Sequence, residues 1–176
     1  YTGDKAVTLV FMGDGAVGIG PTHEGMTLAG LWDLPVVFIV ENNQYSMGTP
    51  LYRTLAVPDL TERAGGFDIA RDRFRGDDVL EVRERIGRAV DRARNEFMPT
   101  LIEVETYRFR GHSISDPGTY RSKDEIEQWK KRDAVLIARE LPGKQRVWPY
   151  LVAGFAVALL GFARLYFGAH WLSDIV

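Results

Sequence analysis

The feature that most limits the fold is a pair of short, almost wholly apolar runs rich in β-forming residues, at residues 6–12 and 35–40. Such runs are typical of strands buried on both faces of a parallel sheet, because a strand with one face in water would alternate apolar and polar residues. Between them, residues 22–33 have a helical pattern of apolar side chains. The segment therefore predicts a strand–helix–strand unit.

The alternation of strands and helices continues along the chain after a polar loop at residues 41–58. A capping box at Asp78 predicts a helix that extends to residue 97, and residues 100–104 form a third apolar strand pattern. A loop is expected at residues 107–121, and Ser122 opens another helix with a second capping box. This order predicts an α/β fold with an open, mostly parallel sheet flanked by helices, in which ligands bind beyond the carboxyl ends of the strands.

Composition and charge remove several classes of function. The length of 176 residues suits one ordinary domain, and the formal charge of −2 gives no electrostatic reason to expect nucleic acid as a partner. The chain has no cysteine, which excludes disulfides and cysteine-based metal sites and leaves the redox compartment open.

The first candidate motif, Gly13-Asp14-Gly15-Ala16, follows the first predicted strand. Glycines let the backbone turn tightly and approach a ligand, so that N–H groups can hold a phosphate. The carboxylate between them is a hard oxygen ligand of the kind that Mg²⁺ prefers. Taken alone, the motif is better explained by a plain turn at the end of a strand.

The second motif, Asn42-Asn43, follows the second predicted strand, and Asn43 lies 29 residues after Asp14. If the two strands are parallel neighbours, Asp14 and Asn43 lie side by side at one edge of the sheet. A carboxylate, an amide oxygen and a backbone carbonyl, together with two phosphate oxygens, would complete a Mg²⁺–diphosphate site. The alternative is that both asparagines only stabilise the loop, since asparagine favours turns.

The third motif, Arg108-Phe109-Arg110-Gly111-His112-Ser113, lies in the long loop after the third predicted strand. Two arginines and a histidine could bind a phosphate or a substrate carboxylate, or could transfer a proton. From composition alone, an ordinary polar loop is the better explanation of the segment.

Residues 1–139 resemble the alpha subunit of the thiamine-diphosphate-dependent 2-oxo acid dehydrogenases, with pyruvate dehydrogenase as the nearest pattern. The Gly-Asp-Gly and Asn-Asn motifs at this separation are the thiamine diphosphate fingerprint of that family. Further matching segments lie around them: His23-Glu24, Leu31-Trp32, Glu41-Asn42-Asn43, Tyr45-x-Met47-Gly48-Thr49, residues 106–113, residues 115–121 and residues 129–133.

The resemblance assigns roles to individual residues. Asp14, Asn43 and the Tyr45 carbonyl are expected to bind Mg²⁺, while Gly13, Gly15 and Ala16 line the diphosphate site. His112 is expected to lie at the cofactor and to assist acyl transfer to lipoamide, and Arg108 to be the arginine of the cofactor loop. Ser113 matches the serine that is phosphorylated in mitochondrial relatives. The family continues after Gly-Asp-Gly-Ala with Asn-x-Gly, whereas this chain has residues 17–21 without an asparagine, so polar contacts from that turn are in doubt.

The resemblance also implies partners and a reaction. The reaction is oxidative decarboxylation of a 2-oxo acid, with acyl transfer to a lipoyl-bearing acyltransferase. The chain would form a heterotetramer with a beta subunit, in the cytoplasm or the mitochondrial matrix. Pyruvate is the expected substrate, and branched-chain 2-oxo acids or acetoin stay open. Because the family's N-terminal portion and the beta subunit are absent, the chain alone is expected to be inactive.

The C-terminal part has a different pattern. Residues 140–146 form a junction, and residues 147–176 are a hydrophobic segment that is uncharged up to Arg164. A membrane-spanning helix needs about 20 apolar residues, so residues 147–170 are a candidate membrane segment, with a buried core helix as the alternative.

Residues 163–174 resemble the last motif of the type 2 phosphatidic acid phosphatase family through Arg164, His170 and Asp174, although Ala163 replaces its serine. The other two motifs of that family are missing from the chain, so phosphatase activity is not predicted. A membrane lipid phosphatase fragment and a non-catalytic remnant are the alternative readings of the whole chain.

We predict that removal of the residues after Arg139 improves solubility and leaves cofactor binding unchanged, because nothing in residues 1–139 is patterned to cover a long apolar surface. Sedimentation of the shortened and the complete chain in detergent-free buffer measures the first effect. Unfolding of the shortened chain, followed by circular dichroism, would show instead that the segment belongs to the core.

Overall fold

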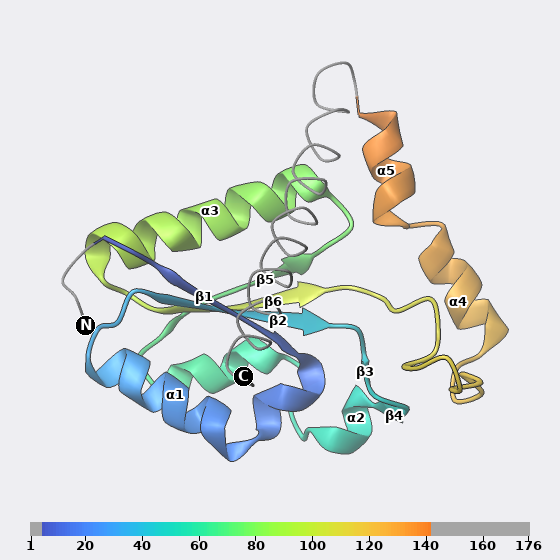
Figure 1. Cartoon of the computed structure of the whole chain (residues 1–176), viewed down its shortest axis with the longest axis horizontal. Helices are drawn as coiled ribbons and strands as arrows, with labels where there is room; N and C mark the ends of the chain where they lie inside the picture. Colours follow the sequence, from blue (N-terminus) through green and yellow to red (C-terminus); the bar gives the residue numbers. More distant parts are fainter. Residues whose placement is uncertain (1–4, 142–176) are drawn as a thin grey trace, which may run out of the picture. The chain divides into compact units, whose positions relative to one another are not determined.

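The computed structural model describes residues 5–141 and contains a four-stranded parallel sheet (Figure 1). The strands lie in the order β1-β2-β6-β5. Their bounds are Thr8–Gly13 for β1, Val36–Asn42 for β2, Ala70–Arg75 for β5 and Thr100–Glu105 for β6. All three pairings are parallel, which confirms the predicted α/β architecture.

Helices cover both faces of the sheet, with α1 (Gly20–Leu31) on one side and α3 (Val79–Glu96) on the other (Figure 1). Alternate residues of β2 serve the two faces. Phe38 and Val40 pack in the cluster that contains Met26 of α1, while Val37 and Ile39 pack in the cluster that contains Ala89 of α3. This double burial explains the continuous apolar runs that predicted the strands.

Shorter elements connect this framework. They are the 3₁₀ helices η1 (Asp14–Gly18) and η2 (Leu60–Gly66), the two-stranded sheet of β3 (Tyr45–Ser46) and β4 (Thr49–Pro50), and helices α2 (Leu51–Thr54), α4 (Lys123–Lys130) and α5 (Ala134–Glu140). The chain divides into two compact units, Tyr1–Ala134 and Val135–Val176. Of the second unit, the structure describes only residues 135–141, which are most of α5 and the residue after it.

Three predicted strands and the helices α1, α3 and α4 are confirmed within a few residues. Strand β5 was not predicted, and the predicted loop at residues 41–58 contains β3, β4 and α2. Strand β5 has arginine at every second position and one aspartate, and only Phe74 is buried. Because β5 is an edge strand, its pairing with β6 rather than its own hydrophobic pattern defines it.

The two predicted capping boxes are formed only in part. Asp78 accepts hydrogen bonds from the backbone N–H groups of Leu80 and Glu81, and Ser122 accepts one from Glu125. These bonds satisfy donors that a helix start leaves free. The Glu125 carboxylate, however, accepts hydrogen bonds from the hydroxyls of Tyr45 and Tyr107.

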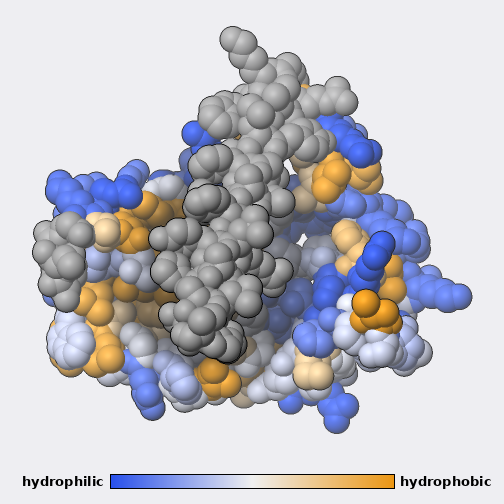
Figure 2. Space-filling view, in the orientation of Figure 1, coloured by the Kyte–Doolittle hydropathy of each residue, from blue (hydrophilic) through white to orange (hydrophobic). Residues whose placement is uncertain are grey.

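Hydrophobic side chains lie among charged ones on the visible surface (Figure 2). Phe11 on the edge strand β1 is 61% exposed, and Leu31 at the end of α1 is 70% exposed. None of the helices described within residues 5–141 is long and apolar enough to cross a membrane. The candidate membrane segment at residues 147–170 and the phosphatase-like motif at residues 163–174 lie outside the described residues.

Candidate functional site

The carboxyl ends of β1 and β2 lie side by side, which confirms the predicted adjacency of the first two motifs. The strands pair in register from Thr8 with Val36 to Gly13 with Glu41. Asp14 directly follows Gly13, the last residue of β1, and Asn43 lies two residues after Glu41 of β2. The backbone N–H of Asn43 lies close enough to the Asp14 carboxylate to oppose the rise of its pKa, so the two motifs are neighbours.

The Asp14 carboxylate is buried, with 1% of the residue exposed, and its Oδ2 has no hydrogen-bond partner among the described residues. Burial raises the pKa of Asp14, and backbone N–H groups and the charge of Arg108 oppose that rise. A buried carboxylate oxygen without a donor is costly unless a cation or another group completes it. The observation fits the Mg²⁺ ligand that the resemblance implies.

The two glycines around Asp14 differ in their surroundings. A Cβ atom added at Gly13 would meet no atom within 4 Å, so there is open space in front of this backbone for a ligand. A Cβ atom added at Gly15 would lie 2.1 Å from Oγ of Ser46. Gly15 is therefore required for close packing against β3, and Gly13 leaves room for the predicted diphosphate. The following residue, Ala16, accepts a hydrogen bond at its carbonyl from the Thr22 hydroxyl, 2.8 Å away.

The chain reverses between Asn42 and Tyr45 in a turn fixed by asparagine side chains. Oδ1 of Asn42 accepts from the backbone N–H of Gln44 at 2.9 Å, and Oδ1 of Asn43 accepts from that of Tyr45 at 3.3 Å. Gln44 has a left-handed backbone with φ of 71°. Both bonds are of the local kind through which asparagine stabilises turns. Among residues 5–141 no three His, Cys, Asp or Glu side chains gather to hold a metal.

Arg108 lies within electrostatic reach of Asp14 because the long loop folds back toward β3 and β4. Its guanidinium donates to the Met47 carbonyl in the turn between these strands, and to the Tyr120 hydroxyl at 3.1 Å. Arg121 holds the loop from its other end by donating to the carbonyls of Arg108 and Arg110. The positive charge of Arg108 acts to lower the pKa of Asp14, as expected of a group that also favours a bound anion.

His112 is exposed, and its backbone N–H donates to the Asp116 carboxylate at 2.6 Å. Hydrogen bonds from His112, Gly118 and Tyr120 lower the pKa of Asp116 to about 2, so this carboxylate stays ionised. A cavity of about 520 Å³ adjoins the loop and is lined by Arg110, Gly111, His112, Ser113, Ile114 and Asp116. The histidine ring is thus available at the surface while its backbone is anchored.

Sequence reasoning did not find the aromatic cluster that joins the loop to the β3 turn. Glu125 accepts both tyrosine hydroxyls at 3.0 Å, and the buried Arg121 guanidinium lies 5.2–5.9 Å from the ring centres of Tyr45, Tyr107 and Tyr120. Burial and the Glu125 hydrogen bond raise the pKa of Tyr45 to about 12, so its hydroxyl stays protonated. The recurrence of tyrosine around both motifs is the only sequence signal for this cluster.

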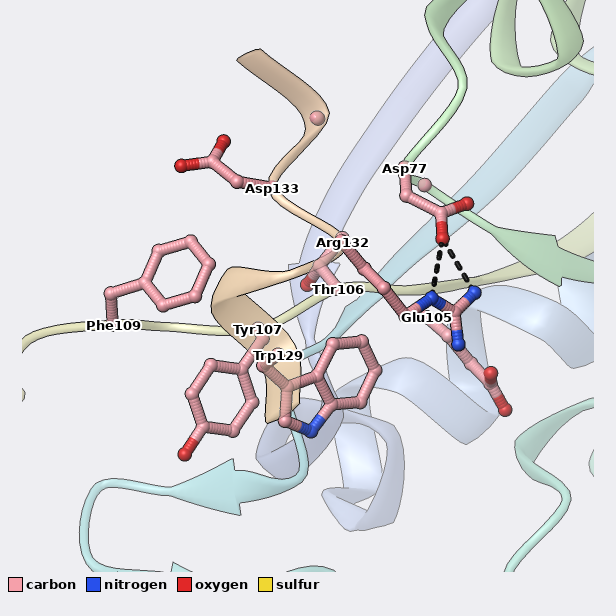
Figure 3. A pocket seen from close by; sticks show the side chains of 10 residues that line it. Asp77, Glu105, Thr106, Tyr107, Phe109, Trp129, Arg132 and Asp133 are labelled. Atoms are coloured by element: carbon pink, nitrogen blue, oxygen red, sulfur yellow. Dashed lines mark hydrogen bonds and ion pairs between the residues drawn. The ribbon is translucent and has the colours of Figure 1, made fainter. Parts of the chain in front are cut away.

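A smaller cavity of about 190 Å³ lies at the ends of β5 and β6 (Figure 3). Trp129 stacks on Tyr107 there, with ring centres 5.1 Å apart, and Arg132 is paired with Asp77 (Figure 3). Arg132 and Asp77 therefore neutralise each other, and the carboxylates of Glu105 and Asp133 also line this cavity.

Comparison with known proteins gives one family. The family described as "Dehydrogenase E1 component" matches residues 1–148. The chain is 43% identical over 141 residues to "Pyruvate dehydrogenase E1 component subunit alpha" of Rickettsia bellii, covering 80% of this chain and 43% of that protein. The proteins of the same name from Rickettsia felis and Porphyra purpurea are each 44% identical, covering 80% and 76% of this chain and 43% and 39% of theirs. The chain thus spans less than half the length of these relatives.

The raised pKa of Asp14 predicts that Asp14→Asn stabilises the metal-free protein at pH 7, because it removes a buried charge. The sign follows from linkage: protonation favours the folded state, so the wild type gains stability as the pH falls through the raised folded pKa toward 3.8. The advantage of the variant should therefore shrink on acidification. Denaturant unfolding at pH 7 and pH 4 measures it, with Asp91→Asn, on the exposed side of α3, as a control expected to shift stability by less than about 0.5 kcal/mol. A loss of stability in Asp14→Asn at pH 7 would contradict the prediction.

Proposed function

The chain belongs to the dehydrogenase E1 component family, and we propose that it acts in the alpha subunit of a thiamine-diphosphate-dependent pyruvate dehydrogenase. The reaction is oxidative decarboxylation of the 2-oxo acid with acyl transfer to lipoamide. The observation that supports this most strongly is the unpartnered, buried Oδ2 of Asp14 beside Asn43, at the carboxyl ends of two adjacent parallel strands. The shared name of the relatives supports pyruvate as the substrate.

The residues at the strand ends fit a magnesium-bound diphosphate. Asp14 would supply a carboxylate oxygen, Asn43 its amide oxygen and Tyr45 its backbone carbonyl, which are oxygen ligands of the kind Mg²⁺ takes. The open space at Gly13 and the backbone of Gly15 and Ala16 would accommodate the diphosphate. Thiamine diphosphate, when bound, supplies the nucleophilic carbon and the electron sink for decarboxylation.

The chain's own residues would position the cofactor and transfer a proton. Arg108 donates a hydrogen bond to the Met47 carbonyl. Its positive charge acts on Asp14 and would also act on the phosphates. His112 presents an imidazole that can give or take a proton during acyl transfer. The remaining contacts are assigned to a beta subunit, and the acceptor is the lipoyl arm of an acyltransferase. We place the enzyme in the cytoplasm, or in the mitochondrial matrix if the source is eukaryotic.

Asp14→Ala tests the proposal in the complete alpha subunit assembled with its beta partner. Magnesium affinity and cofactor affinity should both fall, because the metal bridges the protein to the diphosphate. Calorimetric titration of Mg²⁺ and thiamine diphosphate measures both affinities, and Asp91→Ala on the exposed side of α3 is the control. Normal titration by Asp14→Ala would remove this carboxylate from the site.

His112→Gln tests the role of the histidine loop. Acyl transfer to lipoamide should fall by about a hundredfold, the usual effect of losing a proton-transfer group, while decarboxylation with an artificial electron acceptor continues. The same substitution at His23, whose ring lies against Phe67, is the matched control and should leave the ratio of the two rates unchanged. An unchanged ratio in His112→Gln would assign the proton transfer to another group.

A further inference from the structure

We propose that Glu103 is a positioning residue that fixes the turn from Asn42 to Tyr45 in the shape required for metal binding. The proposal rests on the proposed function, because it concerns how the chain holds the predicted Mg²⁺ ligands. Glu103 lies on β6, which separates β2 from the edge strand β5 (Figure 1).

Glu103 is a completely buried carboxylate with both oxygens in use. Oε1 accepts from the Asn42 side-chain amide at 2.7 Å, and Oε2 accepts from the backbone N–H of Leu60 at 2.9 Å. Arg73 on β5 approaches Oε1 to 3.5 Å. A buried carboxylate is tolerated only when hydrogen bonds or charges compensate it, so these contacts explain how Glu103 is accommodated in the sheet.

The carboxylate determines which way the Asn42 amide points. A carboxylate accepts hydrogen bonds and donates none, so the NH₂ group of Asn42 must face Glu103. The amide oxygen then faces the opposite way, where it accepts from the backbone N–H of Gln44 at 2.9 Å. Asn42 is itself completely buried, so water cannot replace either bond.

The bond from Gln44 to Asn42 stabilises a conformation that a residue other than glycine rarely adopts. Gln44 has φ of 71°, in the left-handed region that is unfavourable for L-residues with a side chain. Its reversal carries the chain from β2 to Tyr45, and Asn43 lies within this turn, at the sheet edge where β1 ends and Asp14 follows. Glu103 therefore acts through Asn42 and Gln44 on both predicted ligands that follow.

A matched control lies two residues along the same strand. Glu105 is also paired with Arg73, at 2.5 Å, but its side chain is 24% exposed and makes no hydrogen bond to Asn42. Glu105→Gln and Glu103→Gln remove the same charge next to the same arginine. Only Glu103→Gln leaves the Asn42 amide and the Leu60 N–H with a single acceptor oxygen between them.

The experiment titrates Mg²⁺ at saturating thiamine diphosphate in the complete alpha subunit assembled with its beta partner, and follows cofactor binding by circular dichroism. Glu103→Gln should raise the half-saturating Mg²⁺ concentration about fivefold to tenfold, the effect of one hydrogen bond, with little change in the KM for pyruvate. Glu105→Gln should stay within about twofold of the wild type. A Glu103→Gln value within twofold of the wild type, or an equal rise in both variants, would overturn the proposal.

Two further measurements separate positioning from stability alone. Asn42→Ala should raise the half-saturating concentration similarly, and its combination with Glu103→Gln should add little, because both changes break one interaction. If Glu103→Gln does not fold, Asn42→Ala decides the question by the same twofold criterion. A lower melting temperature in a variant with normal Mg²⁺ titration would show a purely structural role. Failure of the wild type to titrate would instead contradict the proposed function.

Discussion

The candidate site depends on the parallel pairing of β1 with β2, because that pairing brings two polar turns to one edge of the sheet. Both strands are mostly apolar; β2 ends in Glu41 and Asn42, and β1 is followed directly by Asp14. The packing of α1 against one face and α3 against the other fixes the register between them. A shift of one residue would exchange the two faces of β2 and move Asn43 away from Asp14.

Two buried carboxylates near this edge show how burial can serve different purposes. Glu103 has donors for both oxygens, whereas Asp14 has an oxygen with none among the described residues. Burial raises the pKa of both. A buried carboxylate with donors for both oxygens fixes the orientation of those donors. A buried carboxylate with a free oxygen can bind a cation. The two adjacent asparagines differ as well: the Asn42 amide donates to Glu103, whereas the Asn43 amide oxygen accepts from the Tyr45 N–H.

The sequence was sufficient for features that depend on local pattern or on adjacent strands. The apolar runs predicted β1, β2 and β6, and the strand–helix–strand order predicted that Asp14 and Asn43 would meet. Glu103 was not predicted because it lies 61 residues from Asn42, and one acid in an apolar strand gives no sign of its partner. Strand β5 was not predicted because its charged residues do not give the apolar pattern of a buried strand. They are tolerated here because β5 is at the edge of the sheet. Glu125 suggested a reciprocal helix cap, but two tyrosine hydroxyls from distant segments compete for it.

The loop that carries Arg108 and His112 has no regular structure, and side chains hold its backbone instead. Arg121 donates to two of its carbonyls, and Asp116 accepts from the N–H groups of His112 and Gly118. These hydrogen bonds involve backbone groups of the loop, so they fix its conformation without involving the imidazole of His112. The ring stays exposed beside a cavity, while Arg108 is turned toward the strand ends. An anchored backbone with an exposed side chain would suit the proton transfer proposed for His112, because a proton donor must be positioned yet accessible.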